Sequence, residues 1–187
     1  MPSSATYYTD TYNGNVFIGS TAVGGVKPPA TNATAQTYAI WNPLGSGKNI
    51  IPLAIDVGFV DTTSAAGNIC LSYQTGMGSQ VATGAAVTAA TLVAPLNAYL
   101  SAGNSSIAKF APASLTLGAG STFLMTLGFN QLVTTAATTS APGWTWHWEG
   151  NGRLIVPPGV GIFITGATAV LSNVDIVTYW EEAPTSG

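Results

Sequence analysis

Ionised side chains are scarce in this 187-residue chain, in which only 6% of the residues are charged. A typical soluble domain carries about a quarter. The four Lys and Arg residues are too few for a surface that tracks nucleic-acid phosphates. They also form no polybasic patch that would bind an anionic membrane. We therefore expect neither nucleic acid nor a membrane surface as a partner.

Cysteine and histidine each occur once, as Cys70 and His147. A single cysteine excludes an intrachain disulfide and a thiolate zinc cluster. Any Ser-His-Asp triad, Cys-His pair or histidine-ligated metal would have to use His147. A cupin-type metal site needs at least two histidines, so the count excludes it. We predict no catalytic residue, no metal and no cofactor, and hence a protein that is not an enzyme.

Three further features are missing. The N-terminal stretch has no basic region followed by an apolar one, so we expect no secretory signal. The chain has no run of about 18 apolar residues that would predict a membrane-spanning helix. It also has no internal repeat, which argues against propellers and solenoids.

What the sequence has instead is period-two alternation of apolar and polar residues, in short stretches separated by Gly, Pro, Asn, Ser and Thr. This pattern predicts strands and turns. The long strands and wide connections favour an all-β, antiparallel jelly-roll sandwich, with an immunoglobulin-like sandwich as the alternative. The predicted strands cover residues 15–19, 36–41, 49–61, 68–74, 121–133, 144–149, 153–156, 160–165 and 174–181.

We expect residues 1–14 to form an N-terminal arm and residues 15–187 a single jelly-roll domain. Residues 76–104 are predicted to be a long excursion with little regular structure, and their alanines permit a short helix around 89–100. Glu181 and Glu182 are interpreted as the polar end of the last strand. The strand at 49–61 is expected to face the core with the side chains of Ile51, Leu53, Ile55, Val57 and Phe59. The strand at 121–133 is expected to face it with those of Phe123, Met125, Leu127 and Phe129.

The segment GWTWHWEGNG places three indoles on one face of a strand and His147 on the other. We expect His147 to be a surface imidazole that Glu149 orients. A glycosidase needs two carboxylates in one cleft, and Glu149 could meet Asp175 or Glu181 across adjacent strands, but we favour solvated strand ends. The residues predicted to contact a capsid or another subunit are Tyr7, Tyr8, Tyr12, Trp144, Trp146, Trp148 and Trp180.

Charge is distributed unevenly along the chain. Between residue 62 and Trp148 the only formal charge is Lys109. An isolated domain usually carries mixed charges over its surface for solubility, whereas interface cores are depleted in charge. The pattern therefore predicts assembly with copies of the same chain or with a larger particle. The alternative is an extracellular β-domain with a surface rich in Ser and Thr.

Two segments carry a resemblance to a known group of proteins. They are IWNPLGSGKNIIPLAIDVGFV at 40–60 and GRLIVPPGVGIFITG…VDIVTYWEE at 152–182, in a low-charge chain rich in Thr, Ala and Gly. The chain resembles auxiliary virion proteins of tailed bacteriophages, such as head decoration or cement proteins and fibre domains. Those proteins are often jelly rolls that assemble as trimers, similar in outline to tumour-necrosis-factor-like trimers.

The resemblance implies a non-enzymatic virion protein, a homotrimer that decorates or cements a phage head through contacts with the major capsid protein. The alternative that it implies is a receptor- or carbohydrate-binding module of a phage fibre or spike, with a glycan receptor. Exposed, clustered tryptophans would favour the second function, and buried ones the first.

Overall fold

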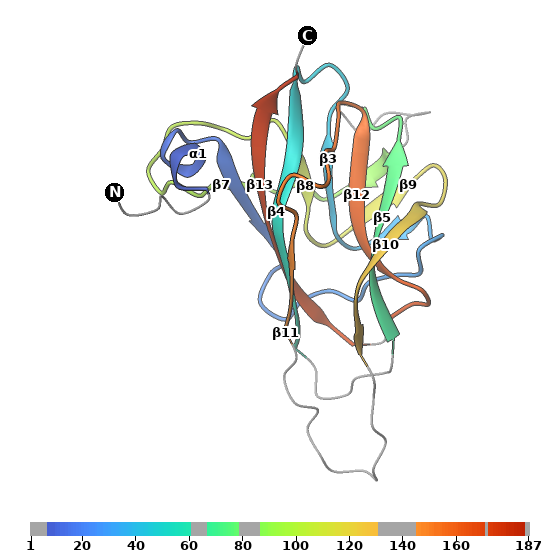
Figure 1. Cartoon of the computed structure of the whole chain (residues 1–187). Coiled ribbons are helices and arrows are strands. Elements are labelled where there is room, and N and C mark those ends of the chain that lie inside the picture. Colours follow the sequence, from blue (N-terminus) through green and yellow to red (C-terminus); the bar gives the residue numbers. More distant parts are fainter. Residues whose placement is uncertain (1–6, 61–66, 79–86, 131–144, 171, 186–187) are drawn as a thin grey trace.

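The computed structural model describes residues 7–60, 67–78, 87–130, 145–170 and 172–185 of the chain. These residues form one short helix and thirteen strands (Figure 1). The elements are α1 (Tyr8–Tyr12), β1 (Val16–Ser20), β2 (Ala35–Gln36), β3 (Ala39–Asn42), β4 (Lys48–Phe59), β5 (Gly67–Thr75), β6 (Val87–Ala90), β7 (Leu96–Asn97), β8 (Lys109–Ala111), β9 (Leu115–Leu117), β10 (Thr122–Asn130), β11 (Thr145–Glu149), β12 (Val160–Gly166) and β13 (Val174–Pro184).

Eight of the strands are paired as one long, folded hairpin. The early strands β1, β3, β4 and β5 pair antiparallel with the late strands β13, β12, β11 and β10, in that reversed order. Further pairs between β4 and β13 and between β5 and β12 roll this hairpin into two sheets. Their strand orders are β11-β4-β13-β1 and β10-β5-β12-β3. Such a rolled double sheet of eight strands is a jelly roll.

The all-β sandwich and its jelly-roll order are therefore confirmed, and the strand order is not that of an immunoglobulin domain. One short strand is added at an edge of each sheet, β7 beside β1 and β8 beside β3. We call the sheet that contains β4 and β13 sheet A, and the sheet that contains β5 and β12 sheet B. Figure 1 shows sheet A on the left and sheet B on the right.

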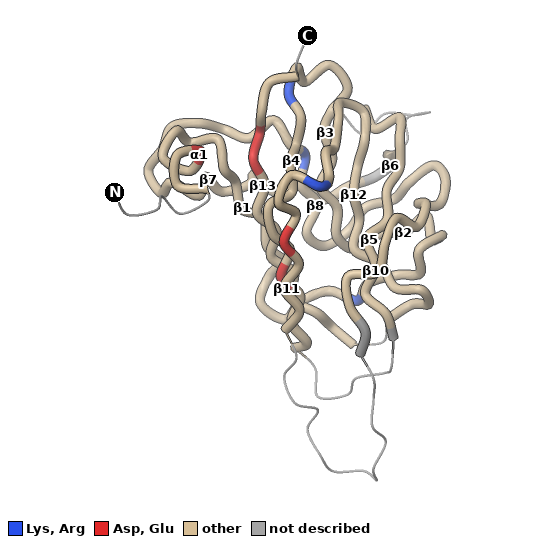
Figure 2. Tube along the Cα trace, viewed as in Figure 1, with Lys and Arg blue, Asp and Glu red and all other residues tan. Residues whose placement is uncertain are grey.

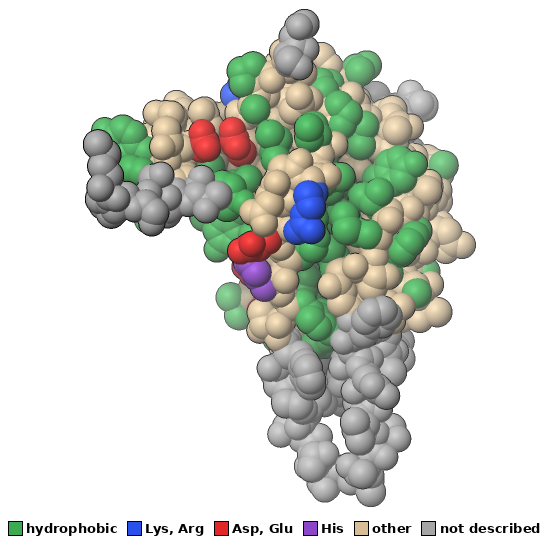
Figure 3. Space-filling view, in the orientation of Figure 1, with side chains coloured by type: hydrophobic (Ala, Val, Ile, Leu, Met, Phe, Trp, Pro, Cys, Tyr) green, Lys and Arg blue, Asp and Glu red, His purple; other side chains and the backbone are tan. Residues whose placement is uncertain are grey.

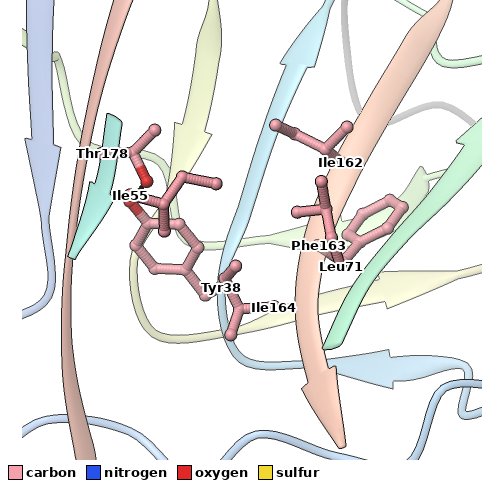
Figure 4. Close-up of a pocket in the computed structure, with 7 residues that line it drawn as sticks. All are labelled: Tyr38, Ile55, Leu71, Ile162, Phe163, Ile164 and Thr178. Atoms are coloured by element: carbon pink, nitrogen blue, oxygen red, sulfur yellow. Dashed lines mark hydrogen bonds between the residues drawn. The ribbon is translucent and has the colours of Figure 1, made fainter. Parts of the chain in front are cut away.

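The main core fills the space between the two sheets. It holds most of the large buried side chains, among them Phe17, Ile55, Leu71, Ile164 and Trp180. Tyr38 connects the sheets, because its hydroxyl donates to Thr178 Oγ1 at 2.8 Å while its ring lies in the core. Burial raises the pKa of this phenol. The space around Tyr38 and Thr178 is too small for a water molecule (Figure 4), so the core is packed and holds no ligand cavity there.

In the described part of residues 76–104 only β6 and β7 are regular, so this excursion has little regular structure as expected, but the short helix expected around 89–100 is not formed. The long connection between β5 and β10 nevertheless adds a second layer. Its strands β6 and β9 form a small third sheet with β2, in the order β2-β9-β6. This sheet, which we call sheet C, covers the outer face of sheet B and closes a second apolar core. That core contains Ala39, Trp41, Met77, Val87, Ala111, Leu115, Leu117 and Phe163.

Bulges shift two of the predicted faces. In β4, Ile55, Val57 and Phe59 face the main core as expected, but Ile50 does so in place of Ile51. The register between β4 and β13 shifts at Tyr179/Trp180, and one extra residue in a strand turns every side chain beyond it to the other face.

A bulge also changes the predicted face of β10, because the register of its pairing with β5 shifts between Phe123 and Met125. Met125 and Leu127 pack against the main core as expected. Phe123 pairs with Ser72 and is half exposed, so its predicted inward orientation is wrong. The predicted inward face of Phe129 lies outside the described side chains. Residues 153–156 contain only a bridge from Val156 to Ile50, so the strand predicted there is also wrong.

A buried carboxylate fixes the excursion to the sandwich. Glu182 is 2% exposed and accepts hydrogen bonds from Ser106 Oγ and from the backbone N–H groups of Ile107 and Ala108. Lys48 Nζ lies 3.5 Å from its other oxygen. The prediction that Glu182 is a polar, solvated strand end is therefore wrong: the carboxylate compensates buried backbone donors that have no sheet partner.

Candidate functional site

Charge is divided between the two sides of the molecule. The eight strands of sheets B and C carry one charged residue, Lys109 in β8. Figure 2 shows the acidic positions on β11, β13 and α1 and along sheet A. The Lys, Asp and Glu residues in the strands of sheet A are Lys48, Asp56, Glu149, Asp175, Glu181 and Glu182.

The outer face of sheet A holds the only histidine. His147 lies opposite Asp56 in the register of β11 and β4, and its Nδ1 is 2.6 Å from Asp56 Oδ1. Its Nε2 is 3.4 Å from Glu149 Oε1. The other oxygen of Glu149 accepts from Asn151 Nδ2 at 3.2 Å. The imidazole is about half exposed, so the predicted surface histidine beside Glu149 is confirmed, with Asp56 as a partner that the sequence did not indicate.

This cluster favours a positively charged imidazole. Hydrogen bonds with Asp56, and then with Glu149, raise the pKa of His147. Hydrogen bonds from Asn151 and His147 lower the pKa of Glu149. Both ring nitrogens face carboxylates, so neither is directed at a hydroxyl or thiol nucleophile, which a His-assisted acyl transfer needs. The cluster is best explained as an electrostatic link between β4 and β11.

Glu149 does not meet the two carboxylates that we paired with it. Strand β4 lies between β11 and β13, which places Glu149 two strand spacings, roughly 10 Å, from Asp175 and Glu181. Along the strands, Glu149 is level with Tyr179 through their common partner Ala54, so both acids are further away still. The carboxylate pair that a glycosidase would need, which we considered and did not favour, is therefore not formed by these residues. No group of three or more His, Cys, Asp and Glu among the described residues could hold a metal ion.

The tryptophans mainly serve the core. Trp180 is fully buried and packs against Phe17 and Phe110, so it offers no surface to a subunit or a capsid, and that prediction is corrected. Trp146 and Trp148 are half buried against the main core, and their outer edges stay available for contact. Trp144 lies outside the described residues.

The predicted tyrosines lie on a projection. Helix α1 and the chain around β7 extend together from one side of the sandwich (Figure 1). We call residues 7–14 and 96–104 the tyrosine lobe. Tyr8 stacks on Tyr12 with 6.1 Å between ring centroids, and Tyr12 stacks on Tyr99 with 5.8 Å. The exposed fractions of these three side chains are 61%, 62% and 46%, and those of the adjacent Leu96 and Leu100 are 67% and 75%.

Asparagine side chains hold the two segments of the lobe together. Asn97 Nδ2 donates to the carbonyl oxygen of Gly14 at 2.8 Å, and Asn104 Nδ2 donates to the carbonyls of Asn13 and Gly14. Gly14 has φ +73°, and a Cβ there would lie 2.5 Å from Asn104. Tyr7 connects the lobe to the turn that follows β11, because its hydroxyl donates to Asn151 Oδ1 at 2.8 Å. The described part of the predicted arm is therefore tied to the domain at several points.

Sequence reasoning missed half of this surface. Tyr99, Leu96 and Leu100 come from the excursion whose structure we could not predict. No local pattern connects them with α1, because an exposed stack of rings from two distant segments has no periodicity. The run LNAYL at 96–100, with three large apolar residues in a polar connection, was the one available signal.

No family model, no curated protein and no solved structure matches the chain. Among the residues that the structure describes, none belongs to a helix of the length and apolar character needed to span a bilayer.

Proposed function

We propose that the chain is a non-enzymatic structural protein of a virion, a homotrimer that decorates or cements the head of a tailed bacteriophage. The observation that carries this proposal is the division of charge between the two sides of the domain. A side made of eight strands with one charge between them is costly to leave in water as a lone surface, but it suits a contact with other protein surfaces.

Two further observations support the proposal. The jelly roll is a fold that viral capsid domains use, although a fold alone does not define a function. The chemistry of the described surface also argues against catalysis, because the sole histidine has both nitrogens against carboxylates on an open sheet face.

The first experiment is the mass of the protein in solution, measured by size-exclusion chromatography with light scattering. We expect three times the 18.9 kDa mass of the chain at micromolar concentration. A monomer under these conditions would contradict the assembly proposal.

A pair of variants locates the contact. Phe123 is 52% exposed at the edge of sheet B, whereas Val23 is fully exposed in a turn outside the neutral strands. Both Phe123→Glu and Val23→Glu place a carboxylate at an exposed apolar position. We expect Phe123→Glu to shift the mass to that of the monomer and Val23→Glu to leave it unchanged. Equal behaviour of the two variants would exclude the neutral side as the subunit contact.

The alternative function, a carbohydrate-binding module of a fibre or spike, requires an exposed aromatic platform. Among the described tryptophans, Trp41 and Trp180 are buried and Trp146 and Trp148 are half buried, so the tryptophans do not favour it. A glycan array probed with the labelled protein tests it directly. Binding to a defined glycan that Tyr12→Ser abolishes would favour this function over the first.

A further inference from the structure

The tyrosine lobe combines features of a preformed protein contact. Tyr8, Tyr12 and Tyr99 and the leucines Leu96 and Leu100 form one exposed apolar surface on a projecting part of the molecule. Large exposed apolar patches on soluble proteins mark interaction sites, and tyrosine is among the residues enriched where binding energy is concentrated. Figure 3 shows apolar side chains gathered on the lobe, and acidic side chains between it and the sandwich.

The lobe is also rigid before it meets a partner. The asparagine bonds described above fix its two segments, and Ser101 adopts φ +82° next to the exposed Leu100. A left-handed conformation is unfavourable for a residue other than glycine and persists only where the surroundings enforce it. A rigid apolar surface loses little conformational entropy on binding.

The base of the lobe carries two carboxylates without a cation. Burial, and then the negative charge of Asp10 in α1, raises the pKa of Glu181 in β13. All four Lys and Arg residues of the chain are described, and none forms an ion pair with either acid. A partner that brings a Lys or Arg to this place would relieve the repulsion between them.

We infer that the tyrosine lobe is the docking surface for the shell protein of the particle, and that it receives apolar side chains flanked by Lys or Arg. This inference rests on the proposed virion function and assigns the shell contact to the lobe, while the neutral side serves contact between copies. A second copy of the chain fits the lobe poorly. Of its four basic side chains, Lys48 is paired with Glu182 and Arg153 donates to backbone carbonyls of its own chain. Only Lys27 and Lys109 remain to meet the two acids, and they lie far apart in the sequence.

The test uses shells of the virus that encodes the chain, stripped of it, and measures binding of the full chain by co-sedimentation. We expect Tyr12→Ser and Leu100→Ser to weaken binding by about tenfold or more. Val23→Ser, which removes a fully exposed apolar side chain elsewhere, should bind as the unmodified chain does. The double variant Asp10→Asn, Glu181→Gln should bind more weakly at low salt and lose most of the salt dependence of binding. Asp175→Asn, an acid on the same strand as Glu181, is its control.

The possible results separate the two proposals. If the unmodified chain does not bind the shells, the proposed function fails and this inference fails with it. If the chain binds and the lobe variants bind within about twofold of it, the function stands and the lobe is not the contact. Loss of the trimer in Tyr12→Ser would instead assign the lobe to contact between copies, and a glycan bound through Tyr12 would assign it to a receptor; each result overturns the inference. Leu100→Ser keeps the test valid if Tyr12→Ser does not fold.

Discussion

Glu182 shows how one residue can position a long connection. Its carboxylate accepts hydrogen bonds from Ser106, Ile107 and Ala108 in a place that water does not reach. Its neighbour Glu181 is on the other face of β13 and only partly buried, and its ionised form is disfavoured by burial and by Asp10. Identical side chains at consecutive positions therefore have opposite effects on stability.

We predict that Glu182→Gln lowers the free energy of unfolding by about 2 kcal/mol, because the amide brings an N–H group against donors that had a charged acceptor. Glu181→Gln, the matched control, should leave it unchanged within about 0.5 kcal/mol or raise it. Urea unfolding of both variants measures the difference. Equal losses in the two variants would contradict the structural role of Glu182.

The His147 cluster predicts a dependence of stability on pH. The pKa of His147 is raised above its ordinary 6.5, so its contribution to stability is fully present below that value and is lost as the pH rises through the raised pKa. The pKa of Glu149 is lowered, so its contribution is lost only in acid, as the pH falls through the lowered value. Between the lowered pKa of Glu149 and the raised pKa of His147 both groups are charged, so in this pH range the cluster stabilises the pairing of β11 with β4 most strongly.

The prediction is that the unmodified chain loses stability relative to His147→Gln as the pH rises from 6.5 through the raised pKa of His147. An NMR titration of the imidazole C–H signals should give a pKa above 6.5. Asp56→Asn should bring it back toward the ordinary value, since Asp56 is the largest cause of the shift. A midpoint at or below 6.5 in the unmodified chain would show that the ion pairs do not form in solution.

Single elements show what could be predicted and what could not. Strands β4, β5, β12 and β13 were predicted within a few residues, because period-two alternation between turn residues reports directly on a strand with one buried face. The faces failed where a bulge adds a residue, as at Phe123 and Ile51. The alternation of apolar and polar residues does not reveal a bulge, because a bulge is defined by the pairing with the partner strand. Sheet C was missed because its strands are two to four residues long.

A glycine in β10, compared with a glycine in a connecting segment, tests the close contact between β10 and β11. A Cβ at Gly128 would lie 2.7 Å from the ring of Trp146, whereas one at Gly103 would meet nothing within 4 Å. We expect Gly128→Ala to lower the free energy of unfolding by about 1–3 kcal/mol and Gly103→Ala to change it by less than about 0.5 kcal/mol. Thermal unfolding and tryptophan emission follow both variants. An unchanged midpoint for Gly128→Ala would mean that β10 and β11 are further apart than described.

At the scale of the whole molecule, the sequence predicted the sandwich and the charge-poor half, but of the candidate contact surface it predicted only the tyrosines of the N-terminal segment. Composition is a property of the chain, so the scarcity of charge between residue 62 and Trp148 was visible without a fold. The tyrosine lobe depends on Tyr12 and Tyr99 meeting in space. Only the docking of the excursion beside β1 produces that meeting, through pairing of β7 with Phe17 and Ile18.

The order of the strands also predicts slow folding. Each strand of the first half of the jelly roll pairs with one from the second half, and domains built from such distant pairings fold slowly. We expect a refolding relaxation time on the order of seconds after dilution from urea, followed by intrinsic tryptophan emission. If the chain is unfolded only briefly before refolding, its prolines keep their native isomers. Slow phases caused by prolyl isomerisation then disappear, and the relaxation caused by strand pairing remains. Complete refolding within a millisecond would contradict the expected barrier.

Strand β13 lies between β4 and β1 in sheet A, and of the eight jelly-roll strands it is the last to leave the ribosome. Until it emerges, the two strands that flank it have no common neighbour, and the edges of β4 and β1 that β13 later covers stay open to other chains. Synthesis of this protein therefore passes through a prolonged stage in which many nascent copies can associate wrongly. Production in cells should depend on chaperones, on low temperature or on slow translation far more than the stability of the finished molecule would suggest.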